Sequence, residues 1–199
     1  MDERLVAWGR AVKARRAKNP ANPRLPVLWL FTDAVRLPDP RGAVARLPRG
    51  LCGVVLRHDG VPGRAALGRA LARLCRARRA MLVVAGDWRL AAALGAGVHL
   101  RAGRRPAGMA RGCAGVTSSA HGVAELVAAR RAGARLAFLS PAFSTASHPG
   151  GVALGPLRWA AAAGRAGVAV AALGGIEGGT VRRLPRAACA GVGAIGALA

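Results

Sequence analysis

A histidine stands at the end of one short apolar run, in a position where it could transfer protons. The run Gly115–Thr117 continues into Ser118-Ser119-Ala120 and then reaches His121. An imidazole changes its charge near neutral pH, so His121 is a candidate general acid or base. The alternative stays open that a serine of this segment caps the following helix and that His121 only packs.

A polar loop follows another apolar run and offers groups that suit an anionic substrate. The run Leu136–Leu139 is followed by the loop Ser140–Gly151, which carries several hydroxyl groups, among them Thr145, and the imidazole of His148. Hydroxyl and imidazole groups can donate hydrogen bonds to phosphate or carboxylate oxygens. The composition predicts a binding loop, with an ordinary solvated loop as the alternative.

Glycines follow one of the last two apolar runs of the chain and lie within the other. Gly174 and Gly175 follow the run Val168–Leu173, and Gly193 lies within the run Gly191–Ile195. Paired glycines let a ligand approach the backbone closely, and the N–H groups at the start of a following helix suit phosphate. Barrels often bind phosphate in the loops after their seventh and eighth strands. The pattern indicates phosphate binding, with tight turns as the alternative.

Other candidate residues are an arginine, a histidine and the cysteines. Arg57 ends the run Val54-Val55-Leu56 and is either a phosphate or substrate anchor or one more surface arginine. His99 lies inside an apolar run and is expected to be a core histidine. The cysteines form no CxxC pair, so we expect reduced thiols rather than a zinc site.

The elements that would position these residues repeat along the chain. Apolar runs recur at a spacing of roughly 17–32 residues, which suits a strand followed by a returning helix. They are continuous rather than alternating, as in parallel strands buried on both faces. The runs begin near Val27, Gly53, Ala80, Gly97, Gly115, Leu136, Val168 and Gly191.

Helical periodicity between these runs predicts helices over residues 64–78 and 123–131. Eight strands with returning helices predict a single (β/α)8 barrel, and an open doubly wound sheet is the alternative. The last run is close to Ala199, so a final outer helix is expected to be missing. A basic helix predicted over residues 3–18 could take its place. Residues 1–23 would form this helix and a linker, and residues 24–199 the barrel.

The charge of the chain is strongly positive, at +23, with 31 Lys+Arg against 8 Asp+Glu. Only Lys13 and Lys18 are lysines, and residues with GC-rich codons dominate throughout. Genomic base composition therefore explains the arginines better than a polyanion site does, and no specific nucleic-acid partner is expected. Neither a secretory signal nor an apolar run of about 18 residues is visible. We expect a cytoplasmic protein that binds no membrane, and a homo-oligomer is possible.

Several runs, in their order and spacing, resemble the thiamine phosphate synthase family and its relative TenI, the thiazole tautomerase. The resemblance extends from Val27 to Leu198. The segments that carry it are LWLFTD (28–33), VVLR (54–57), ALGAGVHL (93–100), SAH (119–121), GARLAFLSPAFSTASHPGG (133–151), VAALGGI (170–176) and GVGAIGAL (191–198).

The resemblance implies a (β/α)8 barrel that binds a thiazole phosphate. The synthase joins this molecule to a pyrimidine pyrophosphate with Mg²⁺ and releases pyrophosphate, whereas the tautomerase moves a proton on the thiazole precursor. The resemblance implies that Gly174 and Gly175 bind the thiazole phosphate through backbone N–H groups. Thr145 would belong to the substrate loop, with His148 where the family usually has lysine.

The resemblance also implies a reacting centre and a second anion site. Ser119 and His121 would lie at the reacting centre, and the histidine that matches His121 transfers the proton in TenI. Arg57 matches the arginine that the synthase directs at the pyrimidine pyrophosphate. Gly193, from its place in the last run, would be a further substrate-binding residue.

The departures from the family pattern concern the metal site. Gly86 stands where the synthase has a metal-binding aspartate, and the neighbouring Asp87 is a weak candidate because it would need a backbone shift. Arg101–Arg105 replace the acidic residues expected after the GVHL segment, and Asp59 replaces a lysine. Mg²⁺ needs oxygen ligands. No cofactor is certain, and Mg²⁺ remains possible although its usual ligand pattern is absent.

Three hypotheses follow from the sequence. The first is a thiamine-biosynthesis enzyme that binds thiazole phosphate, with synthase activity possible only if Asp33, Asp59 or Asp87 binds metal. The second is a tautomerase that needs no metal. The third is a non-catalytic barrel that binds phosphate or polyanions. Arginines gathered on the outer helices would favour polyanions, and arginines at the strand ends would favour small phosphates.

Overall fold

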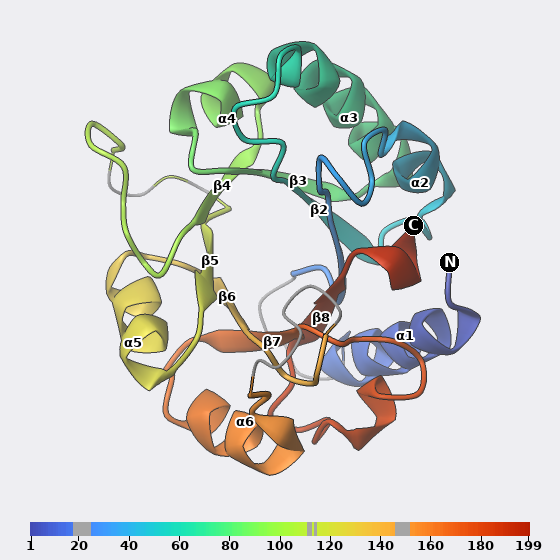
Figure 1. The fold of residues 1–199 in the computed structure, drawn as a ribbon, viewed down its shortest axis with the longest axis vertical. Coiled ribbons are helices and arrows are strands. Elements are labelled where there is room, and N and C mark those ends of the chain that lie inside the picture. The colour runs from blue at the N-terminus through green and yellow to red at the C-terminus, as the bar shows by residue number, and fades with distance from the viewer. Residues whose placement is uncertain (18–24, 111–112, 114, 146–151) are drawn as a thin grey trace.

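Eight parallel strands form a closed barrel in which each strand is hydrogen-bonded to the next and β8 pairs with β1 (Figure 1). This computed structural model describes residues 1–17, 25–110, 113, 115–145 and 152–199. The strands are β1 (Leu28–Phe31), β2 (Cys52–Leu56), β3 (Met81–Ala85), β4 (Gly97–Leu100), β5 (Thr117–Ala120), β6 (Leu136–Leu139), β7 (Ala169–Leu173) and β8 (Gly191–Ala194). The predicted barrel is confirmed, and the alternative of an open sheet is wrong because Leu28 is in register with both Cys52 and Val192.

The interior of the barrel is filled by large side chains from alternating strand positions. Phe138 packs edge-on against both Trp29 and Phe31, with ring centroids 5.4 and 4.8 Å apart. Glycines on the neighbouring strands make room for these rings. A Cβ at Gly53 would lie 2.4 Å from Trp29, and one at Gly193 would lie 2.6 Å from Phe31. The barrel is therefore a packed core, and a ligand must bind above it.

The outer layer consists mainly of helices that return the chain to the next strand. They are α2 (Arg41–Arg46), α3 (Arg64–Arg78), α4 (Trp88–Leu94), α5 (Val123–Arg131) and α6 (Gly155–Gly164). The helices predicted over 64–78 and 123–131 are confirmed with those bounds. The described residues between β4 and β5 form no helix.

The helix that was expected to begin after the glycines at the end of β7 is not present in the described chain. A single 3-10 turn, η1 (Val181–Arg183), stands there instead. Pro185 follows it closely, and a residue before proline is held in an extended conformation, as Leu184 is (φ −75°, ψ 135°). No helix N-terminus is therefore available to bind a phosphate at this point.

The N-terminal helix α1 (Glu3–Ala17) packs on the outside of the barrel beside β8 (Figure 1). Its apolar face of Leu5, Trp8 and Val12 is buried, as its spacing predicted. A Cβ at Gly9 would lie 2.8 Å from the Leu28 side chain, so α1 lies close against β1 as well. The predicted linker and Lys18 lie outside the described residues.

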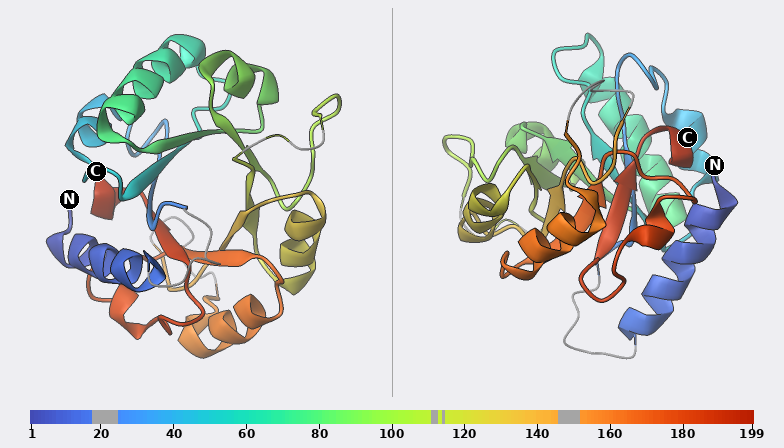
Figure 2. Two further views of the ribbon diagram at one scale, coloured as in Figure 1. Left: turned by 180° about the vertical axis from the view of Figure 1, so that it is seen from behind. Right: turned by 60° about the horizontal axis from the view of Figure 1, so that its bottom comes forward.

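The C-terminal segment lies beside the beginning of α1, and Figure 2 shows the two chain ends next to each other from further directions. After β8 the chain forms the 3-10 turn η2 (Gly196–Leu198). The backbone N–H of Asp2 donates to the carbonyl of Ala197 at 2.8 Å. None of the helices in the described part of the chain has the length and apolar character that a membrane-spanning segment requires.

Candidate functional site

The carboxyl ends of the strands surround a cavity of about 650 Å³. Most of the residues singled out in the sequence line this cavity, although they come from five different strands and loops. They are Arg57, Ser119, His121, Thr145, Gly174, Gly175 and Gly193. His148 lies outside the described residues. The fold therefore gathers the described candidates in one place, at the end of the barrel where ligands of this fold bind.

His121 follows β5 and is held by an acidic residue one helical turn later. Glu125 Oε2 accepts the backbone N–H of His121 at 2.8 Å and lies 3.1 Å from its Nδ1. The His121 side chain is 64% exposed, so it does not merely pack in the core. Gly122 is the N-cap of α5 and no side chain caps it, so the alternative of a serine cap is wrong.

The serines of β5 hold the neighbouring turn rather than the helix. Ser119 Oγ accepts the backbone N–H of Ala102 at 3.2 Å, and Ser118 Oγ accepts that of Gly103 at 2.9 Å. These bonds fasten the tight turn from Arg101 to Arg104, which follows β4. Ser119 thus lines the cavity and also fixes the residues beside it.

One side of the cavity, here called the glycine wall, consists of Gly174, Gly175 and Gly193. Gly174 and Gly175 have φ angles of +92° and +64°, which side chains rarely adopt. A Cβ at Gly175 would lie 2.4 Å from the carbonyl oxygen of Ser144 in the polar loop. The two loops after β6 and β7 therefore touch through bare backbone, and only glycine fits there.

A second part of the lining, here called the arginine wall, consists of Arg36, Arg57 and Arg101, which follow β1, β2 and β4. Arg36 and Arg57 share one carboxylate, because Asp33 Oδ2 lies 3.1 Å from Arg36 Nη2 and 3.0 Å from Arg57 Nη2. The backbone N–H of Arg57 also donates to Thr32 Oγ1 at 3.0 Å. These contacts position both guanidinium groups at the ends of β1 and β2.

The pKa of Asp33 reflects this arrangement. The backbone N–H of Arg36 is the largest cause, and it donates to Asp33 Oδ1 at 3.0 Å. Together with the Arg36 guanidinium and the Val35 N–H it outweighs burial and lowers the pKa of Asp33 to about 2. Asp33 is therefore ionised throughout the ordinary pH range and keeps the two arginines in place.

A chain of ion pairs continues from Arg101 along the rim. Arg101 Nη2 lies 2.6 Å from Asp59 Oδ2, and the other oxygen of Asp59 lies 2.9 Å from Arg64 Nη2. Arg64 Nη1 is 3.6 Å from Asp87 Oδ2, and its Nη2 donates to the carbonyl of Ala85. Each of these aspartates is thus engaged by a guanidinium group.

His99 lies below the cavity and is buried, as its place in an apolar run predicted. Its Nδ1 is 2.9 Å from Thr117 Oγ1. Burial, followed by the positive charges of Arg57 and Arg101, lowers the pKa of His99 to about 3. The imidazole is therefore neutral at ordinary pH and adds no positive charge to that of the arginine wall.

The donors around the cavity do not fit Mg²⁺. Gly86 brings no side chain to the rim, and Asp87 Oδ1 accepts the N–H of Leu90 as the N-cap of α4. Asp33 and Asp59 are held by arginines. In the part of the chain that the structure describes, no three His, Cys, Asp or Glu residues are placed to hold a metal ion. The weak candidate Asp87 thus has a structural role here.

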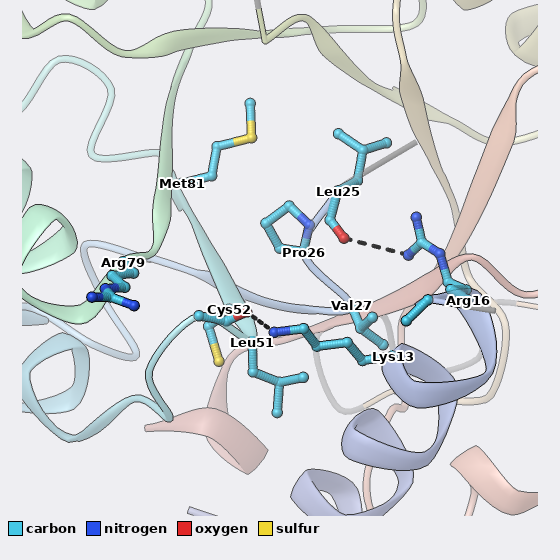
Figure 3. Close-up of a pocket in the computed structure, with 11 residues that line it drawn as sticks. Lys13, Arg16, Leu25, Pro26, Val27, Leu51, Cys52, Arg79 and Met81 are labelled. Carbon is cyan, nitrogen blue, oxygen red and sulfur yellow. Dashed lines mark hydrogen bonds between the residues drawn. The ribbon is translucent and has the colours of Figure 1, made fainter. Parts of the chain in front are cut away.

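A second pocket, of about 560 Å³, opens at the other end of the barrel, before β1, β2 and β3 (Figure 3). Two of its cations, both on α1, bind backbone carbonyl groups. Lys13 Nζ donates to Gly50 at 2.7 Å, and Arg16 Nη1 donates to Ala190 at 2.7 Å and to Leu25 at 3.4 Å. These contacts fasten α1 to the base of the barrel. Residues at this end of the fold contribute to stability, whereas catalytic residues lie at the other end.

The four cysteines are free thiols, as expected, and three of them are buried. Burial raises the pKa of Cys52 and Cys75 to about 12 and that of Cys189 to about 11. A nucleophilic or metal-binding cysteine needs its thiolate form. These three side chains are therefore packing residues.

Sequence reasoning missed several members of the site. Arg36 lies in a turn without a regular pattern, and Arg64 and Glu125 look like ordinary helix-surface residues. Asp33 and Asp59 carried a usable signal, because acidic residues are rare in this chain and both follow a strand end. Their sequence positions suggested a role as metal ligands, whereas in the structure both form ion pairs with arginines.

Comparison with known proteins supports the assignment of the fold. The family model described as thiamine monophosphate synthase matches residues 43–198. A thiamine phosphate pyrophosphorylase from Pyrococcus furiosus is 22% identical, with 86% of each chain covered and a TM-score of 0.70. One from Bacteroides thetaiotaomicron is 21% identical, with 86% of this chain and 83% of that chain covered and a TM-score of 0.59.

The barrel also resembles proteins of other kinds. An HpcH/HpaI aldolase/citrate lyase family protein from Burkholderia cenocepacia is 18% identical, with 91% and 92% of the two chains covered and a TM-score of 0.59. At such identities the likeness shows the fold alone. No curated protein sequence matches this chain significantly. The family model, which covers most of the chain, is specific, and the chain therefore belongs to the thiamine monophosphate synthase family.

Proposed function

We propose that this chain is an enzyme of thiamine biosynthesis that binds a thiazole phosphate at the mouth of its barrel. The observation that carries the proposal is the shared cavity, in which the described candidates from separate parts of the chain meet. Family membership agrees with it. In this proposal the phosphate binds to backbone N–H groups of Gly174 and Gly175, with Gly193 and the Thr145 hydroxyl nearby.

In the proposed reaction His121 transfers a proton on the thiazole ring. Glu125 lies beside Nδ1, and a carboxylate there favours the tautomer with the proton on Nδ1. The lone pair of Nε2 is then free to accept a proton from the substrate and to return it to another atom of the ring. This step needs no metal ion, which agrees with the finding that the side chains around the cavity do not fit Mg²⁺.

The arginine wall favours a second candidate function, the coupling of the thiazole phosphate to a pyrimidine pyrophosphate. Arg57 and its neighbours form a basic surface within the same cavity. Other arginines, such as Arg69, Arg73 and Arg76, are exposed on α3. Arginines therefore occur both on an outer helix, where they would favour a polyanion, and at the strand ends, where they would favour a small phosphate. Those at the strand ends support a small phosphate ligand.

Proton exchange on the thiazole carboxylate phosphate in D₂O tests the first function. We expect exchange with the native chain and a loss of about 10²–10⁴-fold in the His121→Ala variant, the usual range for a general acid or base. The control is Arg158→Ala, an exposed residue of α6. Exchange that is unchanged in His121→Ala would exclude the proposed role of this histidine.

A second assay separates the two functions. The purified chain is supplied with thiazole phosphate and the pyrimidine pyrophosphate, with and without Mg²⁺, and thiamine phosphate is measured. Product without metal would identify coupling as an activity of this mouth. Product that depends on Mg²⁺ would contradict the conclusion that the donors do not fit this ion.

A further inference from the structure

The guanidinium group of Arg101 lies at the rim of the cavity, close to the backbone of Gly86, which has no side chain. A Cβ built on Gly86 would lie 4.0 Å from both Nε and Nη2 of Arg101. Gly86 follows β3 and Arg101 follows β4, so the positive charge of Arg101 lies between the ends of these two strands. A fixed positive charge therefore occupies this edge of the mouth.

The turn that carries Arg101 is fastened on two sides. The serines of β5 accept the N–H groups of Ala102 and Gly103, as described above. On its other side the turn lies against α5, since a Cβ at Gly103 would lie 2.5 Å from the carbonyl carbon of Ala128. The base of the Arg101 side chain is thus held by the fold, while the guanidinium group is held by Asp59.

The charges along this rim favour an anion. Arg101 and Arg64 share Asp59, and Arg36 and Arg57 share Asp33. At Asp33 two guanidinium groups face one carboxylate. Arg64 also pairs with Asp87, so two aspartates balance Arg101 and Arg64, and the excess of positive charge on this side comes from Arg104 and Arg105. A hollow of about 390 Å³ adjoins the cavity at Arg101 and is also lined by Arg64 and Arg104. Buried His99 is neutral, so it adds nothing to this excess of positive charge.

We propose that the arginine wall binds an anion of the diphosphate class directly, without a divalent cation. Arg101 supplies the positive charge at the Gly86 edge that a metal ion would otherwise provide, and Arg57 supplies it on the β2 side. A guanidinium group binds phosphate oxygens through two parallel N–H···O bonds, which gives both charge and geometry. Asp59 and Asp33 keep the two arginines in position.

This inference depends on the proposed function only for the position of the ligand cavity. The arginines of the arginine wall bind the anion by themselves, so Mg²⁺ does not increase the affinity. The inference does not depend on His121 or on proton transfer. The two proposals can therefore fail separately.

Calorimetric titration with inorganic pyrophosphate tests the inference, in EDTA and at several Mg²⁺ concentrations. We expect binding in EDTA that is no tighter with Mg²⁺, and no comparable binding of sulfate at equal ionic strength. Binding that requires Mg²⁺, or equal binding of sulfate, would overturn the inference. Proton exchange on the thiazole substrate is a separate readout, which tests the proposed function and not this inference.

Variants locate the site. Arg101→Ala should weaken binding about tenfold or more, as expected for lost hydrogen bonds to a charged group. Arg101→Lys keeps the charge without the paired donors and should bind with an intermediate affinity. Arg69→Ala, an exposed arginine of α3, changes the net charge equally and should leave binding unchanged.

Thermal unfolding of each variant shows that it is folded before its affinity is compared. An Arg101→Ala variant that binds pyrophosphate as well as Arg69→Ala does would overturn the inference. If Arg101→Ala does not fold, Arg101→Lys provides the same test, and native affinity in that variant would also contradict a role for the paired donors.

Discussion

The two walls of the cavity are built on different physical grounds. The glycine wall is defined by sterics, because at Gly175 the backbones of two loops meet where no side chain fits. The arginine wall is defined by charge, because Asp33 and Asp59 hold guanidinium groups over the strand ends. One wall offers bare backbone and the other offers long charged side chains, so each suits a different part of a ligand.

This difference has consequences for how each wall can be disturbed. A steric wall should be sensitive to a single methyl group and insensitive to pH. A wall held by carboxylates should tolerate changes of size and respond to acid. The four predictions below follow from this contrast.

Gly175→Ala should have the largest effect on stability. Its φ of +64° and the 2.4 Å approach to the Ser144 carbonyl both oppose a side chain. We expect a loss of about 3 kcal/mol in the free energy of unfolding, from strain and overpacking together. Gly60→Ala is the matched control, since it has a φ of +70° and open space around its Cβ, and it should cost about 1 kcal/mol. Equal losses in urea unfolding would contradict the steric account.

Asp33→Asn should remove a pH-dependent part of the stability. The folded pKa of about 2 lies below the ordinary value of 3.8 for an aspartate. The ionised carboxylate therefore contributes about 2 kcal/mol above pH 4, and this contribution disappears as the pH falls toward 2. Unfolding of the native chain and the variant, measured at pH 6 and pH 3, should show a smaller difference at pH 3. A difference that stays constant with pH would contradict the charge account.

Asp2→Ala should have a smaller effect, at the base of the loop that carries the glycine wall. Asp2 Oδ1 caps α1 through the N–H groups of Arg4 and Leu5, and its Oδ2 accepts that of Gly178. We expect a loss of about 1 kcal/mol in the free energy of unfolding, typical of an N-cap.

The sign of the pH dependence at Asp2 is the same as at Asp33. Burial alone would raise the pKa of Asp2, but its backbone donors together lower it. Its contribution is therefore present above the pKa of the unfolded chain and is lost as the pH falls. Glu3→Ala, at an exposed neighbour, is the control for chemical denaturation. A loss in Glu3→Ala as large as in Asp2→Ala would argue against the cap.

Glu125→Gln should have the smallest effect on stability. The pair with His121 is largely exposed, and such pairs contribute less than about 1 kcal/mol. If His121 acts as proposed, the variant should nevertheless slow proton exchange about tenfold, because the neutral amide oxygen of glutamine is a weaker acceptor for Nδ1–H than the carboxylate and does not stabilise the protonated imidazole. Unfolding and exchange rates measured together separate these effects. An unchanged exchange rate would show that Glu125 does not position His121.

Much of the fold could be predicted from the order of residues alone. Continuous apolar runs such as Leu136–Leu139 predict buried parallel strands, and the Ala/Arg/Leu segment Arg64–Arg78 predicts a helix with those bounds. The short turn Val181–Arg183 was not predicted, because Pro185 holds the preceding Leu184 in an extended conformation and so ends a segment whose composition suits a helix.

The candidate site was predictable in part. Strand ends mark the positions of Arg57, His121 and Gly174, since parallel strands bring their carboxyl ends to one edge. The partners of these residues were not predictable. Glu125 and Arg64 lie on helices, and the orientation of each helix about its own axis decides which of its side chains face the cavity. The separate role of Ser119 in fastening the Arg101 turn depends on the spacing between β4 and β5.

The sequence by itself determined the succession of eight strands, the helices at the N-terminus and over residues 64–78 and 123–131, the family, and the residue types around the cavity. It also showed that the residues expected to bind Mg²⁺ are replaced. Only the tertiary structure decided that Asp33, Asp59 and Asp87 serve arginines and a helix cap rather than a metal. The physical reason is that the use of a carboxylate depends on which donors lie within hydrogen-bond distance of it, and for Asp33 and Asp59 these include Arg57 and Arg101, which follow other strands.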